Sequence, residues 1–582
     1  MIVLSAEKER YLKEIHAPVT VGVPPEDAVR DMCQMPDGEI RIYGREIMPG
    51  GEVVRCCSYS RDYGLNWQKE LIFDPETLGA MTYNPHSGEW VTTVSFRNGT
   101  YPMPSMSSLK DGSYAVISKG GPGSTEKEFH LISENFYVVH RQPILLRSRN
   151  RMLVTTQMYL PERKVLAPVV LYSDDSGRTW HEKILETLGV FPVSFPHKGL
   201  RWQQYACEPT VVELGSGRLM LAARNSWGKH CIYYSEDQGE NWSAPAFSDS
   251  FYTCNTMPLL KRMSDGKLLF FWCNTQPLPE LDHEKDQWGL SEGDIAGRSE
   301  DVFTNRDANH AAVSLDDGAT WQGFREIALN AARNFSDFRS FASGLTLDKS
   351  VHQFEALELP YGKVLLFFGQ SPAARRLMIF DPDWLLEKGR KEDFYTGLVN
   401  VSTQVFVNSI SGCHRPCSGH CSWNRTHGAM LVPDPAHDFT EVLQIVTPDD
   451  PRLFNRTQGC VWNFPAIRKG VVRVRLQIAG EPLRLSLTDR WFNPCDGCVA
   501  YDAQLSCVLD RNQTPAGKWN EVRIIFDLDK NTAELCIGDE RKWALPVRGG
   551  APAGLSYLIL QNTSQIPDFE GTLVKSMEVS EE

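Results

Sequence analysis

An eight-residue pattern, S-x-D-x-G-x-(T/N)-W, occurs four times in this chain of 582 residues and restricts what the chain can fold into. Each copy follows a short apolar stretch. In such a loop the short Asp side chain accepts hydrogen bonds from nearby backbone N–H groups, Gly adopts a positive φ, and Trp folds back onto a sheet. The pattern therefore predicts β-hairpin loops that recur along the chain. Its copies are Ser60, Asp62, Gly64, Trp67; Ser173, Asp175, Gly177, Trp180; Ser235, Asp237, Gly239, Trp242; and Ser314, Asp316, Gly318, Trp321.

A second, fainter repeat consists of two apolar runs joined by a turn residue, and it occurs six times. Almost no helical periodicity separates the copies. Strand-turn-strand units repeated in this way are typical of sheets arranged radially around an axis. We therefore expect a six-bladed β-propeller over about residues 1–395, closed by its N-terminal strand. The turn residues are Gly38, Gly112, Asn150, Gly217, Gly266 and Gly362.

The pattern changes after about residue 395. Segments such as VVRVRLQIAG, LRLSLTD and EVRIIFDLD alternate apolar and polar residues, which is typical of strands with one buried face. We therefore predict a β-sandwich of the jelly-roll type over residues 396–582, so that the whole chain is all-β. This region resembles concanavalin-like or laminin-G-like domains, which implies either a sugar-binding module or a structural support for the propeller.

The charge balance excludes some partners. The sequence has 60 Lys and Arg residues against 73 Asp and Glu residues, a net charge of −13, so no overall positive field attracts a nucleic acid. No run of 18 apolar residues is present, and the first residues are charged where a secretory segment is apolar. We expect no membrane partner and a cytoplasmic location for the chain as numbered, or secretion if a leader has been removed.

The fifteen cysteines cannot all pair within the chain, because their number is odd. Cys413, Cys417 and Cys421 form a C-x3-C-x3-C pattern, and Cys495 and Cys498 form a CxxC pattern. Zinc ligation is one interpretation, but the first spacing is not that of a strong zinc motif. Buried thiols or local disulfides are favoured, and we predict no cofactor.

The four loops resemble Asp-boxes, and together with the six-unit count they resemble the sialidase (neuraminidase) superfamily of propeller glycoside hydrolases. Spacing around the loops adds to the resemblance. Glu208 stands before Pro209, and Arg224 follows sixteen residues after Glu208. Arg306 stands eight residues before Ser314 of the last loop. These positions match a glutamate and two arginines of that superfamily.

The resemblance implies an arginine cluster that binds a carboxylate, composed of Arg30, Arg224 and Arg306. Arg30 precedes the first apolar run without the proline of the family pattern, and Arg45 is a further substrate-binding candidate. Guanidiniums bind carboxylates through charge-assisted hydrogen bonds worth about 1.5–3 kcal/mol each. The alternative interpretation is that these are strand-end arginines paired with surface acids.

The catalytic residues of the superfamily have less direct counterparts in this sequence. The resemblance implies a nucleophilic Tyr at the start of the sixth unit, polarised by Glu208, but the position nine residues before Gly362 is Gln353, with His352 beside it. His352 is a candidate base or nucleophile, Gln353 a candidate binding residue, and Tyr205 a candidate replacement for the Tyr.

Three carboxyls are candidates for the acid that protonates the leaving oxygen: Asp31, Glu46 and Glu52. An enclosed carboxyl has a raised pKa, which suits an acid. A polar strand-end role for His352 and a solvated role for each carboxyl remain alternatives.

These features together predict an exo-acting glycoside hydrolase that releases a terminal carboxylated sugar from a glycan, with sialic acid as the first candidate. Two other functions remain open: a non-catalytic glycan-binding protein, and a hydrolase or lyase directed at uronic acids. The missing Tyr leaves the retaining or inverting course of the reaction open as well.

Overall fold

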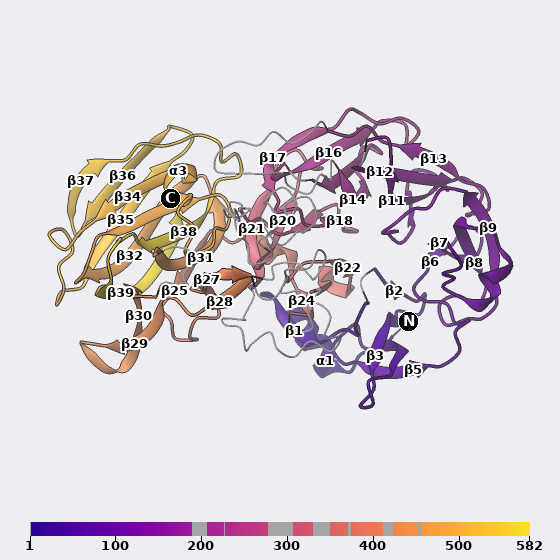
Figure 1. Ribbon diagram of the computed structural model, residues 1–582, viewed down its shortest axis with the longest axis horizontal. Coiled ribbons are helices and arrows are strands. Elements are labelled where there is room, and N and C mark those ends of the chain that lie inside the picture. Colours follow the sequence, from indigo (N-terminus) through magenta and orange to yellow (C-terminus); the bar gives the residue numbers. More distant parts are fainter. Residues whose placement is uncertain are drawn as a thin grey trace.

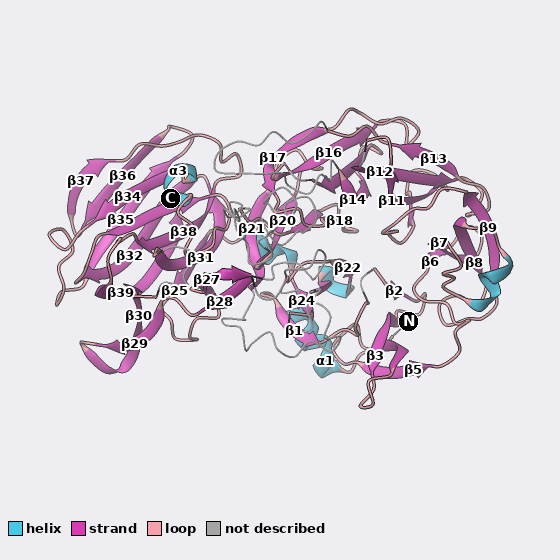
Figure 2. Cartoon of the chain, in the orientation of Figure 1, coloured by secondary structure: helices cyan, strands magenta, loops and turns pink. Residues whose placement is uncertain are grey.

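The computed structural model describes residues 2–28, 30–163, 165–188, 206–225, 227–276, 306–329, 350–369, 374–410, 423–450 and 456–582. Nearly all regular structure in these residues is strand, and the strands form two units (Figures 1 and 2). The first unit is a ring of sheets and the second is a sandwich. This confirms the predicted all-β fold, a six-bladed propeller followed by a β-sandwich.

Six four-stranded antiparallel sheets form the propeller, and in blades one to five the innermost strand comes first in chain order. Blade one contains β2 (Met32–Gln34), β3 (Ile40–Ile47), β4 (Val53–Ser60) and β5 (Gln68–Ile72). Blade two contains β6 (Thr82–Asn84), β7 (Glu89–Phe96), β8 (Gly112–Ser118) and β9 (Glu128–Ser133). Blade three contains β10 (Ile144–Leu145), β11 (Met152–Leu160), β12 (Val165–Ser173) and β13 (His181–Ile184).

The remaining blades repeat this plan. Blade four contains β14 (Cys207–Glu213), β15 (Leu219–Arg224), β16 (Lys229–Ser235) and β17 (Ala246–Tyr252). Blade five contains β18 (Leu259–Arg262), β19 (Leu268–Trp272), β20 (Ala308–Ser314) and β21 (Gln322–Leu329). Blade six contains β22 (Glu355–Glu358), β23 (Val364–Phe368), β24 (Arg376–Phe380) and, as its outermost strand, β1 (Val19–Gly22).

The pairing of β1 with β24 confirms the predicted closure of the ring by the N-terminal strand. Val19 lies opposite Ile379 in this antiparallel pair. Helix α1 (Ala6–Glu14) precedes β1, and its buried Leu12 packs into the apolar cluster of blades one and six. Because the first and last parts of the propeller share one sheet, the ring has no open edge there.

The repeated S-x-D-x-G-x-(T/N)-W loops join the third and fourth strands of blades one, three, four and five. In the second copy, Ser173 Oγ donates to Asp175 at 2.9 Å, and the backbone N–H of Thr179 donates to the same carboxylate at 2.8 Å. Gly177 has φ +91°, and Trp180 Nε1 donates to its carbonyl at 2.8 Å. These contacts are the turn chemistry that the sequence predicts.

One assignment in the second repeat is wrong. Gly112 does not join the first two strands of blade two, since it begins β8. The inner hairpin of that blade turns at Gly88, between β6 and β7. A long connection with the short 3-10 helix Pro104–Ser108 separates β7 from β8. The end of this connection has the same sequence pattern as the repeat, an apolar run followed by a turn residue and a second apolar run. The count of six blades is unaffected.

The second unit contains two facing sheets. The larger has the order β29 (Met430–Asp434), β30 (His437–Thr447), β39 (Asp568–Glu581), β32 (Lys469–Ile478), β35 (Asn520–Asp527), β36 (Thr532–Ile537), β37 (Glu540–Ala544), with β25 (Gly389–Glu392) also paired to β39. The smaller has the order β26 (Val401–Ser402), β31 (Gln458–Ile467), β38 (Leu555–Asn562), β33 (Leu483–Thr488), β34 (Leu505–Leu509). β27 (Val405–Ile410) and β28 (Trp423–Thr426) form a separate pair, and α3 (Val499–Asp502) is a single helical turn.

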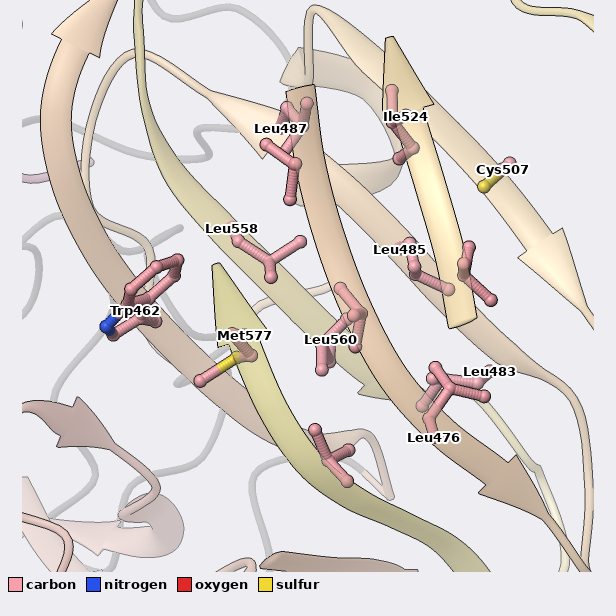
Figure 3. Close-up of a cluster of buried hydrophobic side chains, with 14 of the residues drawn as sticks. Trp462, Leu476, Leu483, Leu485, Leu487, Cys507, Ile524, Leu558, Leu560 and Met577 are labelled. Carbon is pink, nitrogen blue, oxygen red and sulfur yellow. The ribbon is translucent and has the colours of Figure 1, made fainter. Parts of the chain in front are cut away.

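Alternate residues of both sheets fill the space between them, as the period-two pattern predicts. Leu483, Leu485 and Leu487 of β33 are fully buried against Trp462 and Ile524 (Figure 3). The sandwich contacts blade five of the propeller, where Asn463 Nδ2 donates to the carbonyl of Phe324 at 3.1 Å. No helix among the described residues is long and apolar enough to cross a membrane.

Candidate active site

The inner strands of all six blades surround a cavity of about 360 Å³ on the propeller axis, which we call the axial cavity. In Figure 1, β2, β6, β14, β18 and β22 face the middle of the ring. The lining includes Met32, Thr82, Ile144, Val211, Leu260 and Ala356, one residue from each blade. The residues that lead into these strands therefore converge at one end of the cavity.

Four of these converging residues have strained backbones. Their φ angles are positive although none is glycine: +69° at Arg30, +45° at Glu208, +63° at Asn255 and +74° at Gln353. A positive φ in such residues costs about 1–3 kcal/mol each, and such strain gathers at ligand sites. The strain marks this end of the axis as the candidate site.

Two of the predicted arginines meet here. Arg224 Nη1 donates to the carbonyl oxygen of Asn255 at 2.6 Å, and Arg306 Nη2 donates to the same oxygen at 2.7 Å. Both side chains are buried. Neither amide atom of the buried Asn255 side chain has a hydrogen-bond partner among the described residues. We call Glu208, Arg224, Asn255, Arg306 and His352 the guanidinium cluster.

Glu208 and His352 hold the two arginines of this cluster. Glu208 Oε2 lies 2.8 Å from Arg224 Nε, and the Glu208 backbone N–H donates to Gln157 Oε1 at 2.7 Å. His352 Nε2 lies 3.2 Å from Arg306 Nη1. Because a guanidinium only donates, Nε2 accepts this bond and the imidazole proton is assigned to Nδ1. This geometry gives His352 a positioning role toward Arg306.

Arg30 and Asp31 line a second cavity, of about 640 Å³, between blades one and two, which we call the side cavity. Arg30 Nη1 donates to the His140 carbonyl at 3.5 Å. Burial raises the pKa of Asp31 to about 6, although Arg30 and Arg55 oppose the shift. Asp31 thus has the environment of an acid catalyst near neutral pH.

The other sequence candidates lie elsewhere. Arg45 lines the side cavity, but it is half-exposed and lies 3.2 Å from Asp27. Glu46 is ion-paired with Lys69 at 2.6 Å, and Glu52 is exposed in the turn between β3 and β4. Neither glutamate lines the two cavities. Tyr205 lies outside the described residues.

Sequence reasoning missed Arg141, which crosses the axis from blade three. Its Nη2 donates to the Pro258 carbonyl of blade five at 2.6 Å, and its Nη1 donates to the Phe354 carbonyl of blade six at 3.4 Å. Burial lowers the pKa of Arg141 to about 10, and Glu355 and Glu208 oppose this shift. Arg141 stands nine residues before Asn150, the spacing of Glu208 to Gly217, so the same count could have found it.

A hydrogen-bonded chain anchors the carbonyl that Arg30 contacts. His140 Nδ1 lies 2.9 Å from Thr93 Oγ1, and His140 Nε2 lies 2.8 Å from Ser95 Oγ. Burial and the nearby Arg30 lower the pKa of His140 to about 3. The imidazole is therefore neutral at physiological pH and serves this site as a fixed support.

The described residues do not include a candidate metal site. Within the described ranges, no group of three or more His, Cys, Asp or Glu side chains is placed to hold a metal ion. Cys413, Cys417 and Cys421 lie outside those ranges. Cys498 has a free thiol, and Cys495 Sγ donates to Asn493 Oδ1 at 2.8 Å.

One known protein family matches the part of the chain that contains most of the repeated loops. The BNR repeat-like domain family matches residues 128–322, which include three of the four repeated loops. This segment is similar to BNR repeat-like domains. The predicted resemblance to sialidase-superfamily propellers is thereby confirmed at the level of the repeat and the fold. No curated protein sequence matches the chain.

Solved structures similar to this chain include two sialidases. One is Trypanosoma rangeli sialidase in complex with 2,3-difluorosialic acid, at 12% identity over 97% of this chain and 96% of that chain, with a TM-score of 0.34. The other is NanB sialidase from Streptococcus pneumoniae, at 13% identity over 66% of this chain and 73% of that chain, with a TM-score of 0.38.

Proposed function

We propose that the protein is an exo-acting glycoside hydrolase that releases a terminal carboxylated sugar, with sialic acid as the first substrate to test. One observation carries the proposal: Arg224 and Arg306, from different blades, direct guanidiniums at one oxygen in a strained, buried site. Paired guanidiniums suit a carboxylate, to which they make charge-assisted and bidentate hydrogen bonds.

The surrounding groups support a hydrolytic role. Arg30 adds a third positive charge from blade one, and its Nε has no partner among the described residues. Asp31 beside it is the acid in the proposal, since its pKa of about 6 keeps a proton available for the leaving oxygen. Glu208 orients Arg224 and adds a negative charge where positive charge develops on the sugar. The sugar acid then leaves as a free hemiketal or hemiacetal.

Turnover of fluorogenic α-sialosides, with fluorogenic β-glucuronides in parallel, tests this proposal. We expect release of the fluorophore by the wild-type protein and a loss of at least 100-fold for Glu208→Ala. Glu236→Gln is the control, because Glu236 is exposed in the loop between β16 and β17. Equal activity of the wild-type protein and Glu208→Ala would defeat the proposal.

Two other results would replace the proposal with a rival. Glycan binding without turnover would identify a binding protein. Products absorbing in the ultraviolet would identify a lyase, which forms an unsaturated uronate. The acceptor role of His352 Nε2 toward Arg306 favours hydrolysis over elimination, because it occupies the nitrogen that a base would use.

A further inference from the structure

Glu355 lines the axial cavity and has no role in the function proposed above. The charged lining residues of this cavity are Arg141, Lys261 and Glu355. Glu355 begins β22, two residues after the strained Gln353, so at most about 7 Å of chain separates it from the end of the axis where the guanidinium cluster lies. Glu355 therefore lines the axial cavity close to that end of the axis.

Among the described residues, protein groups do not satisfy the side chains of Glu355 and Lys261. The one described hydrogen bond to the Glu355 carboxyl comes from the Ala356 N–H at 3.4 Å. No described hydrogen bond or ion pair engages the Lys261 ammonium. Buried polar groups need partners, and a cavity of about 360 Å³ has room for on the order of ten waters. The axial cavity is therefore suited to hold water in contact with Glu355.

His352 and Gln353, at the start of blade six, are not suited to attack the sugar, so such a water would have to be the nucleophile. His352 is engaged by Arg306, and the amide of Gln353 is a poor nucleophile. We propose that Glu355 is the general base of the reaction and that the axial cavity supplies its water, so that hydrolysis inverts the anomeric carbon. This inference rests on the proposed glycoside hydrolase function.

In the proposed hydrolysis, each bond formed is matched by a bond broken, and each proton has a donor and an acceptor. The water oxygen forms a bond to the anomeric carbon while the bond from that carbon to the leaving oxygen breaks. Glu355 takes one proton from the water, and the leaving oxygen takes the proton of Asp31. Asp31 ends ionised and Glu355 ends protonated, and proton exchange with solvent restores both.

The charges around Glu355 suit a base. Burial raises the pKa of Glu355, while Arg141, Lys261 and Arg30 oppose the shift. A carboxylate with a raised pKa accepts a proton more readily than one in water. Burial lowers the pKa of Lys261, whose ammonium is favoured in turn by Glu355 and Glu358.

The stereochemistry of the wild-type reaction tests the inference without any mutation. With an aryl α-glycoside that the wild-type protein hydrolyses, proton NMR in the first minutes identifies the anomer formed before mutarotation. We expect the β-anomer. The α-anomer would overturn this inference and leave the proposed hydrolase intact, whereas no hydrolysis of any carboxylated glycoside would overturn both.

Two variants of the same strand give a second test. Glu355→Gln should lower kcat by about 100-fold or more and remove the decrease in rate at low pH, since no base remains to be protonated. Glu358→Gln is the matched control, because Glu358 contacts the Ser264 N–H at 2.7 Å at the far end of β22. We also expect azide to accelerate Glu355→Ala and to form a glycosyl azide of inverted configuration. An unchanged pH profile in folded Glu355→Gln would refute the assignment.

Discussion

Replacing Glu326 by Gln should remove a large pH dependence from the stability of the protein. Glu326 lies in β21 at the contact between blade five and the sandwich, and the Tyr557 hydroxyl donates to its carboxylate at 2.7 Å. His310 Nε2 contacts the same hydroxyl. Burial raises the pKa of Glu326 from 4.5 to about 7. The folded protein therefore keeps a proton that the unfolded chain releases near pH 4.5.

The sign and size follow from proton linkage. Between about pH 4.5 and 7 the native state binds more protons than the unfolded state, so the free energy of unfolding falls as pH rises. The pKa difference corresponds to about 3 kcal/mol in the free energy of unfolding, because each pKa unit is worth about 1.4 kcal/mol. Gln has no such titration. The advantage of Glu326→Gln over the wild-type protein should thus grow by about 3 kcal/mol between pH 4.5 and pH 8.

Urea unfolding of the intact chain at several pH values measures this difference. Tyr557→Phe provides a coupled test, because the hydrogen bond from Tyr557 lowers the pKa of Glu326. Without that bond the pKa of Glu326 should rise further, so the loss of stability with pH should be larger and extend to higher pH. Parallel curves for the wild-type protein and Glu326→Gln would refute the claim that this buried carboxyl is protonated in the native state.

Four further substitutions probe the site and the fold. Asp31→Asn should abolish the decrease of kcat/KM as pH rises through about 6, and should slow alkyl glycosides far more than aryl glycosides; equal slowing would exclude an acid role. Arg306→Lys should lower kcat/KM by about 10- to 100-fold, the equivalent of one charged hydrogen bond, and substrate methyl esters, which lack the carboxylate charge, should not show this loss. Asp175→Ala should cost about 0.5–1.5 kcal/mol in thermal unfolding with unchanged activity, because it removes hydrogen bonds to exposed donors of one repeated loop. Trp462→Ala should cost about 3–5 kcal/mol by opening the sandwich core, and a loss below 1 kcal/mol would contradict its packing.

Much of the fold could be predicted from the sequence because its signals are local. The loop from Ser173 to Trp180 forms its hydrogen bonds within eight residues, so its residues alone determine its conformation. The alternation of Leu483, Leu485 and Leu487 likewise reports one buried face of a strand. Gly112 shows the limit of such reasoning. A turn residue after a long connection has the same local appearance as one in an inner hairpin, and only strand pairing separates the two.

The site was less predictable because its contacts join distant blades. The resemblance singled out Glu208, which precedes Pro209, and Arg224 sixteen residues later, and these two residues pair across β14 and β15 of a single blade. It could not show that Arg306 donates to the same carbonyl as Arg224, since Asn255 supplies that oxygen from a separate connection. It also could not separate Asp31 from Glu46 and Glu52, because burial distinguishes them and burial depends on the closed ring.

Closure of the ring also explains why strain is tolerated at the end of the axis. A residue with positive φ persists only where its surroundings fix it, and here each strained residue lies within or before an inner strand that is hydrogen-bonded within its blade. Arg141 then ties blade three to blades five and six through two carbonyls. The charged groups are thus held in place by the fold itself, which in the proposed hydrolase lowers the cost of reorganisation during reaction. A site built from several blades in this way depends on the pairing of β1 with β24, since this pairing closes the ring around the inner strands.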